Sequence, residues 1–210
     1  MRVKICGITK AEQAKAIAEL GATALGFICT SKSPRYISPA KIAEIVAELP
    51  SEIDKIGVFV NADRNEIKKV VDLAGLSGVQ LHGDESPEFC QQIKSDLPQL
   101  ETIKAIALKT RESLSVVKVY LNCVDTLLLD AYHPKMRGGT GKAIDWEILK
   151  EFRSPLPWFL AGGLTPENIS LALSQTQPSG IDLSSGLERV PGDKDLNKVK
   201  DLFKKIKSQS

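Results

Sequence analysis

The sequence predicts an α/β fold, a (β/α)8 barrel of eight parallel strands that forms one domain over residues 1–210. Short apolar runs alternate with amphipathic stretches from one end of the chain to the other. No linker and no shift of composition divides this pattern, and 210 residues suffice for one such barrel. A doubly wound open sheet is the main alternative, but it commonly uses fewer repeats of strand and helix.

Eight strands are expected, each a short apolar run bounded by turn residues. They are placed at residues 2–6, 24–28, 55–60, 78–82, 101–107, 125–130, 157–161 and 180–183. The runs at 58–60 and 127–129 are apolar without interruption. Such runs are typical of parallel strands that are buried on both faces, so they favour a parallel sheet covered by helices.

A helix is expected after each strand, near residues 10–20, 39–49, 64–74, 86–95, 111–120, 145–152, 166–175 and 195–207. Ser38, Ser86 and Thr165 are each followed by proline. This pairing is typical of an N-cap residue ahead of proline at the first helical position. The basic run at 204–207 suits the end of the last helix, because cations stabilise that end of the helix dipole.

The composition is that of an ordinary globular protein. Hydrophobic residues make up 42% of the chain and charged residues 26%, and the net charge is +2, which argues against disorder. Because charges of both signs are interspersed, no basic stripe indicates a nucleic-acid partner. No apolar run approaches the length of a membrane span, and no charged-then-apolar leader follows Met1. We therefore expect neither nucleic acid nor membrane as a partner.

The cysteines are scattered along the chain, at Cys6, Cys29, Cys90 and Cys123. They form no Cys-x-x-Cys motif, and no pair of histidines lies near them. This spacing favours free thiols in a reducing compartment over disulfides or a zinc site. We therefore expect a cytoplasmic protein without a metal centre.

Two connections are longer than the usual few residues of such repeats, at 29–38 and 131–144. Both follow a strand, so in a barrel both lie at the end where the carboxyl ends of the strands meet. Barrels place their chemistry at that end, and a long loop there is more often a substrate lid than an idle connection.

Lys4 and Cys6 lie on one face of the first strand, because successive side chains of a strand alternate. If that face is the barrel interior, the Lys4 ammonium needs an acidic partner, since an unpaired buried charge is very costly. Asp182, in the neighbouring eighth strand, is the candidate partner. The opposite register would bury a lysine and a thiol against the helix layer, so the inward register is favoured.

Cys6 ends the first strand, and Gly7 after it would let a ligand approach the thiol. Most buried cysteines are inert small hydrophobes, but a thiolate here could act as a nucleophile or as a general base. A nucleophilic cysteine normally needs a base beside it, and the chain offers only His82 and His133. His82 would lie across the barrel mouth from Cys6, so the role of general base is favoured.

Asp130 ends the sixth strand, across the barrel from the first. A carboxylate there could simply cap the strand or pair with a cation. Placed opposite Cys6, it could instead flank a ligand, so that one group takes a proton and the other gives one. Such a pair suits the isomerisation of a small molecule.

Turns rich in glycine and serine follow the last three strands, at 138–141, 161–163 and 182–186. Each could be a plain turn. Three adjacent ones are typical of a phosphate site, because barrels often bind phosphate on the turns after strands seven and eight. The expected phosphate-binding residues are Gly139, Gly141, Gly162, Gly163, Ser184, Ser185 and Gly186. We therefore expect a phosphorylated small molecule as the substrate.

Arg35 lies in the long second loop, after Ser33 and Pro34. An arginine in a loop is by default a surface residue. In a loop at the catalytic end it could instead bind a ligand carboxylate with two parallel hydrogen bonds.

A series of motifs runs in order from the first strand to the last. They are KICGIT at 4–9, GF at 26–27, SPR at 33–35, GVFVN at 57–61, QLHG at 80–83, GGTG at 138–141, LAGGL at 160–164 and DLSSGLE at 182–188. Together they resemble the phosphoribosylanthranilate isomerases, (β/α)8 enzymes of tryptophan biosynthesis. The resemblance covers the whole chain. Its departures are mild. Leucine stands at 183 and 187, where valine is usual, a change that should preserve packing, and Cys29-Thr30 occupies a variable part of the second loop.

The resemblance implies one catalytic domain and an Amadori rearrangement of N-(5-phosphoribosyl)anthranilate to 1-(2-carboxyphenylamino)-1-deoxyribulose 5-phosphate. It implies that Asp130 protonates the furanose ring oxygen, that the Cys6 thiolate removes the C2′ proton, and that Arg35 binds the anthranilate carboxylate. No metal or organic cofactor is implied. His82 and Asp182 would lie near the ligand in roles that the resemblance leaves unassigned. The oligomeric state stays open between monomer and homodimer.

Two other functions remain open. A sugar isomerase of histidine biosynthesis performs the same rearrangement on a related barrel, but that family uses aspartates in both roles, which Cys6 argues against. A catalytically silent barrel that only binds a phosphorylated ligand is disfavoured, because Cys6 and Asp130 are both present. Comparing turnover of the two phosphoribosyl substrates would decide between the enzymes.

Overall fold

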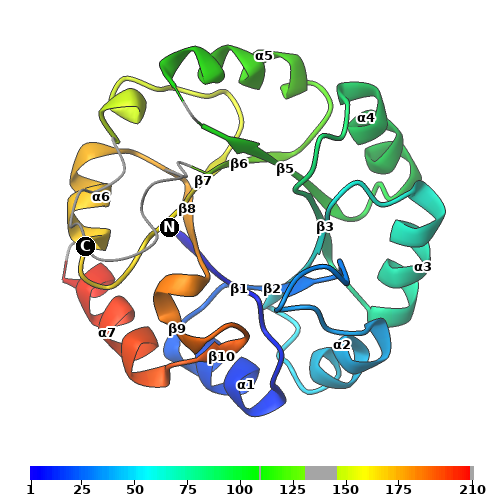
Figure 1. Ribbon diagram of the computed structural model, residues 1–210, viewed down its shortest axis with the longest axis horizontal. Helices are drawn as coiled ribbons and strands as arrows, with labels where there is room; N and C mark the ends of the chain where they lie inside the picture. Colours follow the sequence, from blue (N-terminus) through cyan, green and yellow to red (C-terminus); the bar gives the residue numbers. More distant parts are fainter. Residues whose placement is uncertain (109, 131–145, 209–210) are drawn as a thin grey trace.

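Eight parallel strands close into a barrel, as the sequence predicts, with helices around its outside (Figure 1). The structure is a computed structural model that describes residues 1–108, 110–130 and 146–208. Each strand pairs with the next along the chain, and β1 pairs with β8 to close the sheet. The predicted α/β barrel is therefore confirmed.

The strands match the predicted ranges to within one residue at each end. Their bounds are β1 (Arg2–Cys6), β2 (Ala24–Ile28), β3 (Asp54–Phe59), β4 (Gly78–Leu81), β5 (Glu101–Ala107), β6 (Thr126–Asp130), β7 (Trp158–Ala161) and β8 (Gly180–Leu183). A small apolar cluster that includes Ile56, Leu128 and Phe159 fills the inside of the barrel. A larger apolar cluster lies between strands and helices, so both faces of the sheet are buried.

Helices cover the outside of the barrel. The α-helices are α1 (Ala11–Leu20), α2 (Pro39–Val46), α3 (Arg64–Ala74), α4 (Pro87–Asp96), α5 (Val117–Tyr120), α6 (Ile169–Gln175) and α7 (Leu196–Lys207), and the 3-10 helices are η1 (Arg111–Val116), η2 (Trp146–Leu149) and η3 (Ser185–Leu187). The predicted N-caps of α2 and α4 are confirmed, because the Ser38 and Ser86 hydroxyls accept hydrogen bonds from backbone N–H groups of the first turn. None of the helices among the described residues has the length and apolarity to cross a membrane.

Two of the predicted helices are shorter and tighter than expected. The stretch at 111–120 forms η1 and then one turn of α-helix, α5. The stretch at 145–152 contains the 3-10 helix η2. In η2 the buried side chains of Trp146 and Leu149 are three residues apart. Because side chains at this spacing eclipse in a 3-10 helix, burying both favours the tighter helix.

The predicted start of α6 at Thr165 and the following proline was wrong, since the helix begins at Ile169. The Asn168 side chain accepts a hydrogen bond from the N–H of Thr165 and donates one to the carbonyl of Gly163. These two bonds fix a turn ahead of the helix, so the proline lies in that turn.

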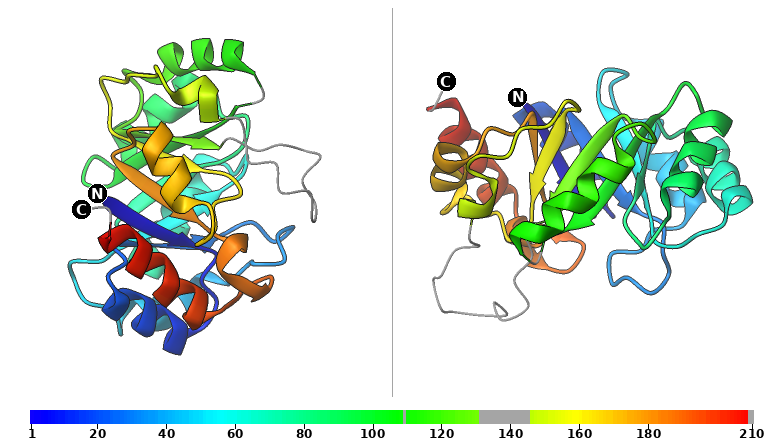
Figure 2. Two further views of the ribbon diagram at one scale, coloured as in Figure 1. Left: turned by 90° about the vertical axis from the view of Figure 1, so that its left-hand side faces the viewer. Right: turned by 90° about the horizontal axis from the view of Figure 1, so that it is seen from above.

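A hairpin that the sequence did not predict follows β8. Its strands, β9 (Glu188–Val190) and β10 (Asp193–Lys194), pair antiparallel, and Gly192 between them has a φ of 81°. Figure 2 shows that this hairpin and the loop between β2 and α2 lie at the same end of the barrel, where the carboxyl ends of the strands meet. The two chain termini lie at the opposite end. The hairpin therefore borders the end at which we expect the chemistry.

Candidate active site

A cavity of about 240 Å³ opens at the carboxyl ends of the strands. Every predicted site residue that the structure describes lines it, namely Cys6, Arg35, His82, Asp130, Gly162, Gly163, Asp182, Ser184, Ser185 and Gly186. Gly139 and Gly141, which we expect at the phosphate, lie outside the described residues, as does His133. The fold thus gathers side chains that are far apart in the sequence into one concave site.

Cys6 is buried at the tip of β1, beside Gly26 of β2. A Cβ atom built on Gly26 would lie only 2.6 Å from the Cys6 sulfur, so the glycine leaves the room that the thiol occupies. Gly7, which follows, has a φ of 80°, a conformation that favours glycine. The two glycines fix the position of the sulfur at the edge of the cavity.

The charge of Lys4 bears directly on Cys6. The inward register of β1 is confirmed, because Lys4 is fully buried and its ammonium lies 3.0 Å from Asp182 Oδ1. Burial opposes the charged form of Lys4, but the charges of Asp182 and Cys6 outweigh it and raise the pKa of the ammonium. Burial also raises the pKa of the Cys6 thiol, and Lys4 counters part of this rise. A thiolate formed here is therefore a strong base held next to a cation.

Asp130 ends β6, on the side of the barrel opposite β1 (Figure 1). Burial, reinforced by the negative charge of Asp182, raises the pKa of Asp130 to about 6. Its Oδ1 atom is buried and has no hydrogen-bond partner among the described residues. A carboxyl group with these properties carries a proton at a pH much nearer neutrality than an ordinary aspartic acid does, which suits a general acid.

His82 lies beside Asp130, and within the described chain no hydrogen bond joins it to Cys6. Its Nε2 atom is 3.8 Å from Asp130 Oδ2, and its Nδ1 atom is 2.7 Å from the side-chain nitrogen of Gln80. Burial lowers the pKa of His82, which favours the neutral ring. When the Gln80 amide donates to Nδ1, the neutral ring carries its proton on Nε2, facing Asp130. This placement does not make His82 a base for Cys6, and His133 lies outside the described residues. The general-base role of Cys6 stays a prediction.

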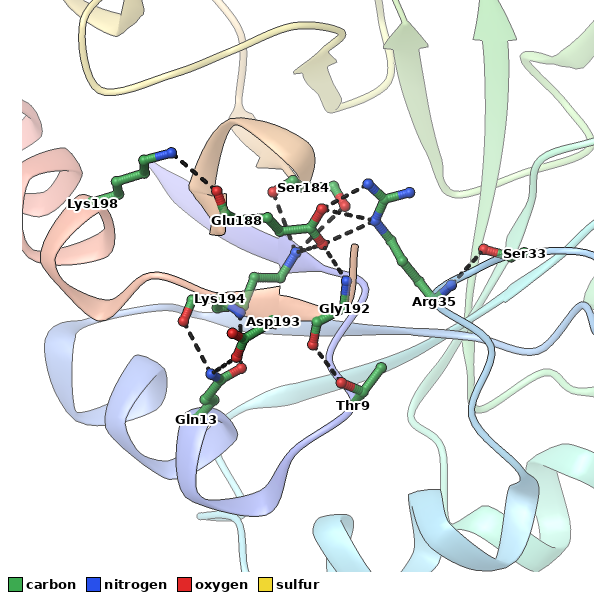
Figure 3. Close-up of polar contacts among 10 residues, drawn as sticks. All are labelled: Thr9, Gln13, Ser33, Arg35, Ser184, Glu188, Gly192, Asp193, Lys194 and Lys198. Carbon is green, nitrogen blue, oxygen red and sulfur yellow. Dashed lines mark hydrogen bonds and ion pairs between the residues drawn. The ribbon is translucent and has the colours of Figure 1, made fainter. Parts of the chain in front are cut away.

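Arg35 binds a carboxylate of the protein itself. Its Nε and Nη2 atoms donate to both carboxylate oxygens of Glu188, in β9, over 2.7 to 3.1 Å (Figure 3). The buried Lys194 ammonium, from β10, lies 2.8 Å from the same carboxylate. Burial would raise the pKa of Glu188, but the hydrogen bonds from Arg35 and Lys194 prevail and lower it.

Sequence reasoning assigned no role to Glu188 or Lys194. Glu188 ended the last motif, at 182–188, without a function of its own. The signal near Lys194 was the Pro191-Gly192 dipeptide, which marks a turn but does not reveal where the turn returns the chain. The structure brings both side chains to the loop that carries Arg35.

The turns after β7 and β8 pack against each other at the cavity. Gly162 and Gly163 have φ angles of 95° and 61°. A Cβ atom on Gly186 would collide with the carbonyl oxygen of Leu164, so only glycine permits this contact. The N–H groups of Gly163, Ser185 and Gly186 donate to no other residue that the structure describes. Neutral donors of this kind suit an anion such as a phosphate.

Within the described residues, no group of three or more histidine, cysteine or acidic side chains is spaced to hold a metal ion. The cavity offers a thiol, a carboxyl group and an array of hydrogen-bond donors.

Comparison with known proteins gives one consistent family. A family model for N-(5'phosphoribosyl)anthranilate (PRA) isomerase matches residues 3–205. An N-(5'-phosphoribosyl)anthranilate isomerase of Gloeothece citriformis is 61% identical over 206 residues, which are 98% of this chain and 94% of the relative. The enzyme of the same name from Nostoc punctiforme is 59% identical over 209 residues, or 100% of both chains.

Solved structures agree along nearly the whole chain. Phosphoribosyl anthranilate isomerase from Thermotoga maritima has a TM-score of 0.90 and 38% identity, with 99% of both chains covered. A structure of this kind of isomerase in complex with reduced 1-(o-carboxyphenylamino)-1-deoxyribulose 5-phosphate has a TM-score of 0.86 and 36% identity over 99% of both chains. Mutually generated monomers of the dimeric Thermotoga maritima isomerase match with a TM-score of 0.84 and 35% identity over 99% of both chains.

Proposed function

The chain belongs to the N-(5'-phosphoribosyl)anthranilate isomerase family, and we propose that the cavity at the mouth of its barrel performs the isomerisation for which the family is named. The function is PRA isomerisation in tryptophan biosynthesis. In chemical terms it is an Amadori rearrangement to 1-(2-carboxyphenylamino)-1-deoxyribulose 5-phosphate. It proceeds by general acid–base catalysis, without a metal or an organic cofactor.

The substrate lies across the cavity with its ribose between Cys6 and Asp130. Its phosphate binds the unused N–H groups of the turns after β7 and β8. Its anthranilate carboxylate meets Arg35, whose Nη1 atom donates to none of the described residues. This orientation follows from the charges, since each anionic end of the substrate faces donors or a cation.

Asp130 acts first, as the general acid. Its proton passes to the furanose ring oxygen, the ring opens, and the electron pair of the anthranilate nitrogen forms the Schiff base. The raised pKa of Asp130, about 6, keeps a usable share of the carboxyl protonated near neutral pH. His82 lies beside this carboxyl, with Nε2 3.8 Å from Oδ2.

Cys6 acts second, as the general base. Its thiolate removes the proton from C2′, which leaves an enolamine, and tautomerisation then gives the ketone. The buried Lys4 ammonium compensates the negative charge on sulfur, while Asp182 holds Lys4 in place. Because the thiolate and the carboxyl group face the ribose from opposite sides, neither group has to move during the reaction.

The observation that carries this proposal is that Cys6 and Asp130, from opposite strands, line one cavity with the glycine turns. The histidine-pathway isomerase is the weaker alternative, because a thiol stands where that family uses an aspartate. A silent phosphate-binding barrel is weaker still, because the pKa of Asp130 is tuned to about 6, which mere binding of phosphate does not require.

The test follows the fluorescence of freshly made PRA as the protein consumes it. We expect the wild type to consume PRA much faster than the histidine-pathway substrate. Cys6→Ser should lower kcat by at least about 100-fold, the low end of general acid–base contributions. Cys123→Ser, which changes a partly exposed cysteine away from the cavity, is the matched control and should keep normal turnover. Near-normal turnover in Cys6→Ser would contradict the base assignment.

We also propose that the enzyme works in the cytoplasm as a monomer or a homodimer. All four cysteines are free thiols, which suits a reducing compartment. The dimeric relative from Thermotoga maritima makes a homodimer the first state to test. Light scattering at several protein concentrations distinguishes the two states, and a larger assembly would contradict both.

A further inference from the structure

Three charged side chains form a cluster (Figure 3), and Arg35 among them lines the cavity. Arg35 comes from the loop after β2, while Glu188 and Lys194 come from the hairpin after β8. Glu188 is 4% exposed and Lys194 is fully buried, so water screens their interaction little. The mechanism above uses Arg35 and assigns nothing to the other two. Their function is therefore a separate question.

The Glu188 carboxylate is saturated with donors. Arg35 reaches both of its oxygens, the Lys194 ammonium lies 2.8 Å from Oε1, and the N–H of Gly192 donates to Oε1 at 3.1 Å. This arrangement holds Arg35 by its Nε and Nη2 atoms. Its Nη1 atom, which donates to no described residue, stays available at the cavity.

A fork to Glu188 alone would work against the binding of an anion. The charges of Arg35 and Glu188 would cancel, so the pair would carry no net charge. An incoming carboxylate would also be repelled by Glu188, which lies only about 3 Å from the guanidinium. Lys194 changes this balance, because its positive charge compensates Glu188. The three side chains together carry two positive charges and one negative charge, so one net positive charge is left for the ligand.

From this geometry we infer that Lys194 sets the specificity of the site for a carboxylate-bearing ligand. It neutralises Glu188, so that Glu188 can position Arg35 without cancelling the charge of the guanidinium. Lys194 is thus a positioning residue that acts through Glu188 and touches no reacting atom. The inference rests on the proposed function, because it requires Arg35 to meet the anthranilate carboxylate.

The backbone of Lys194 is held independently of its ammonium, which besides Glu188 contacts the carbonyl of Ser184 at 3.3 Å. Gln13 holds the backbone of Lys194 by accepting from its N–H at 2.9 Å and donating to its carbonyl at 3.0 Å. Thr9 donates to the carbonyl of Gly192 at the turn. These bonds persist when the lysine side chain loses its charge, so the hairpin stays anchored beside α1.

The test measures binding of two ligands by calorimetry. One is reduced 1-(o-carboxyphenylamino)-1-deoxyribulose 5-phosphate, and the other is the same molecule without its ring carboxylate. Lys194→Met should lower the affinity for the carboxylated ligand by at least about tenfold, and the affinity for the carboxylate-free ligand by less than about twofold. Lys55→Met, which removes a buried lysine near the other end of the barrel, is the matched control and should change neither affinity.

The double variant Glu188→Gln with Lys194→Met gives the sharpest outcome. It again carries one net positive charge, so it should recover the affinity for the carboxylated ligand to within about threefold of the wild type. A residue that only supports the fold would show no such recovery. If Lys194→Met fails to fold, the double variant decides alone: preference for the carboxylated ligand supports the inference, and loss of that preference overturns it.

Arg35→Ala separates failure of this inference from failure of the proposed function. If Arg35→Ala leaves the preference for the carboxylated ligand unchanged, the assignment of Arg35 to the anthranilate carboxylate is wrong. If Arg35→Ala abolishes the preference but Lys194→Met keeps it, that assignment stands and the role of Lys194 is overturned.

Discussion

The two ends of the barrel differ in how completely their charged groups are paired. At the end that holds the termini, Arg2 of β1 lies 2.6 Å from Glu101 and 2.7 Å from Asp54, and the Thr126 hydroxyl also donates to Glu101. At the mouth, one carboxylate oxygen of Asp130 is buried without a partner among the described residues. At the end that holds the termini these charged groups are paired, whereas the mouth keeps one buried carboxylate oxygen without a hydrogen bond among the described residues.

This difference agrees with the proposal that the chemistry takes place at the mouth and not at the closed end, the end that holds the termini. A buried carboxyl without a full set of partners reduces the stability of the folded state, so it is retained where its altered acidity is useful. The mouth also holds a thiol of raised pKa beside a buried ammonium. At the opposite end the charged groups of Arg2, Asp54 and Glu101 are already paired with one another.

The largest expected effect is the difference in kcat between two variants that each lose one carboxylate, one at the mouth and one at the closed end. Asp130→Asn should lower kcat by at least about 100-fold, because an amide cannot give up a proton to the ring oxygen. Asp54→Asn makes the same chemical change at the other end and should keep kcat near the wild-type value. Steady-state assays with PRA measure both. Equal losses in the two variants would contradict the division between the ends.

The sequence predicts the mouth well where strand order alone determines position. Cys6 and Asp130 end their strands, so a closed barrel necessarily brings them to the same end, and the alternation of β1 places Lys4 inside with Asp182. These inferences need only the two-residue period of a strand and the circular order of the repeats.

The hairpin and its ion pairs could not be predicted in this way. β9 and β10 have three and two residues, too few for an alternating pattern to emerge. Arg35 and Glu188 are 153 positions apart, and neither residue type reveals its partner. The sequence predicted a two-pronged contact of Arg35 with a carboxylate of the ligand, and that contact stays a prediction. It offered no sign that Glu188 of the protein itself forms such a contact with Arg35.

The contribution of Asp130 to the unfolding free energy should depend on pH in the direction opposite to that of an ordinary paired carboxylate. The pKa of Asp130 is raised to about 6 in the folded state, so the folded protein binds more protons than the unfolded chain between roughly pH 4 and pH 6. Its contribution to the unfolding free energy is present at low pH and is lost as the pH rises through 6. Asp130→Asn removes this loss.

The measurement is urea unfolding of the wild type and Asp130→Asn at pH 4 and pH 7. The stability of the variant relative to the wild type should increase from pH 4 to pH 7, by up to about 3 kcal/mol. Other carboxylates titrate equally in both proteins and cancel in this comparison. A relative stability that is independent of pH would show that the Asp130 carboxyl is solvated like an ordinary one.

KM can be compared after the loss of an arginine at the mouth, Arg35, and of an arginine away from it, Arg64. Arg35→Ala should raise KM for PRA by about tenfold with a smaller change in kcat, because in the proposed mechanism Arg35 holds the substrate carboxylate and transfers no proton. Arg64→Ala, which breaks a comparable ion pair with Asp96 between α3 and α4, is the control and should leave KM unchanged. A fall in kcat alone would contradict the binding role of Arg35.

The smallest expected effect concerns the closed end. Glu101→Gln removes the negative charge that Arg2 contacts but keeps an acceptor for Arg2 and Thr126. Since Arg2 and Glu101 are both partly exposed, the unfolding free energy should fall by only about 1 kcal/mol. kcat and KM should not change, because no atom of this network reaches the cavity at the mouth. A loss of turnover larger than the loss of stability would mean that the closed end transmits strain to Cys6 through β1, and the two ends would then no longer be independent.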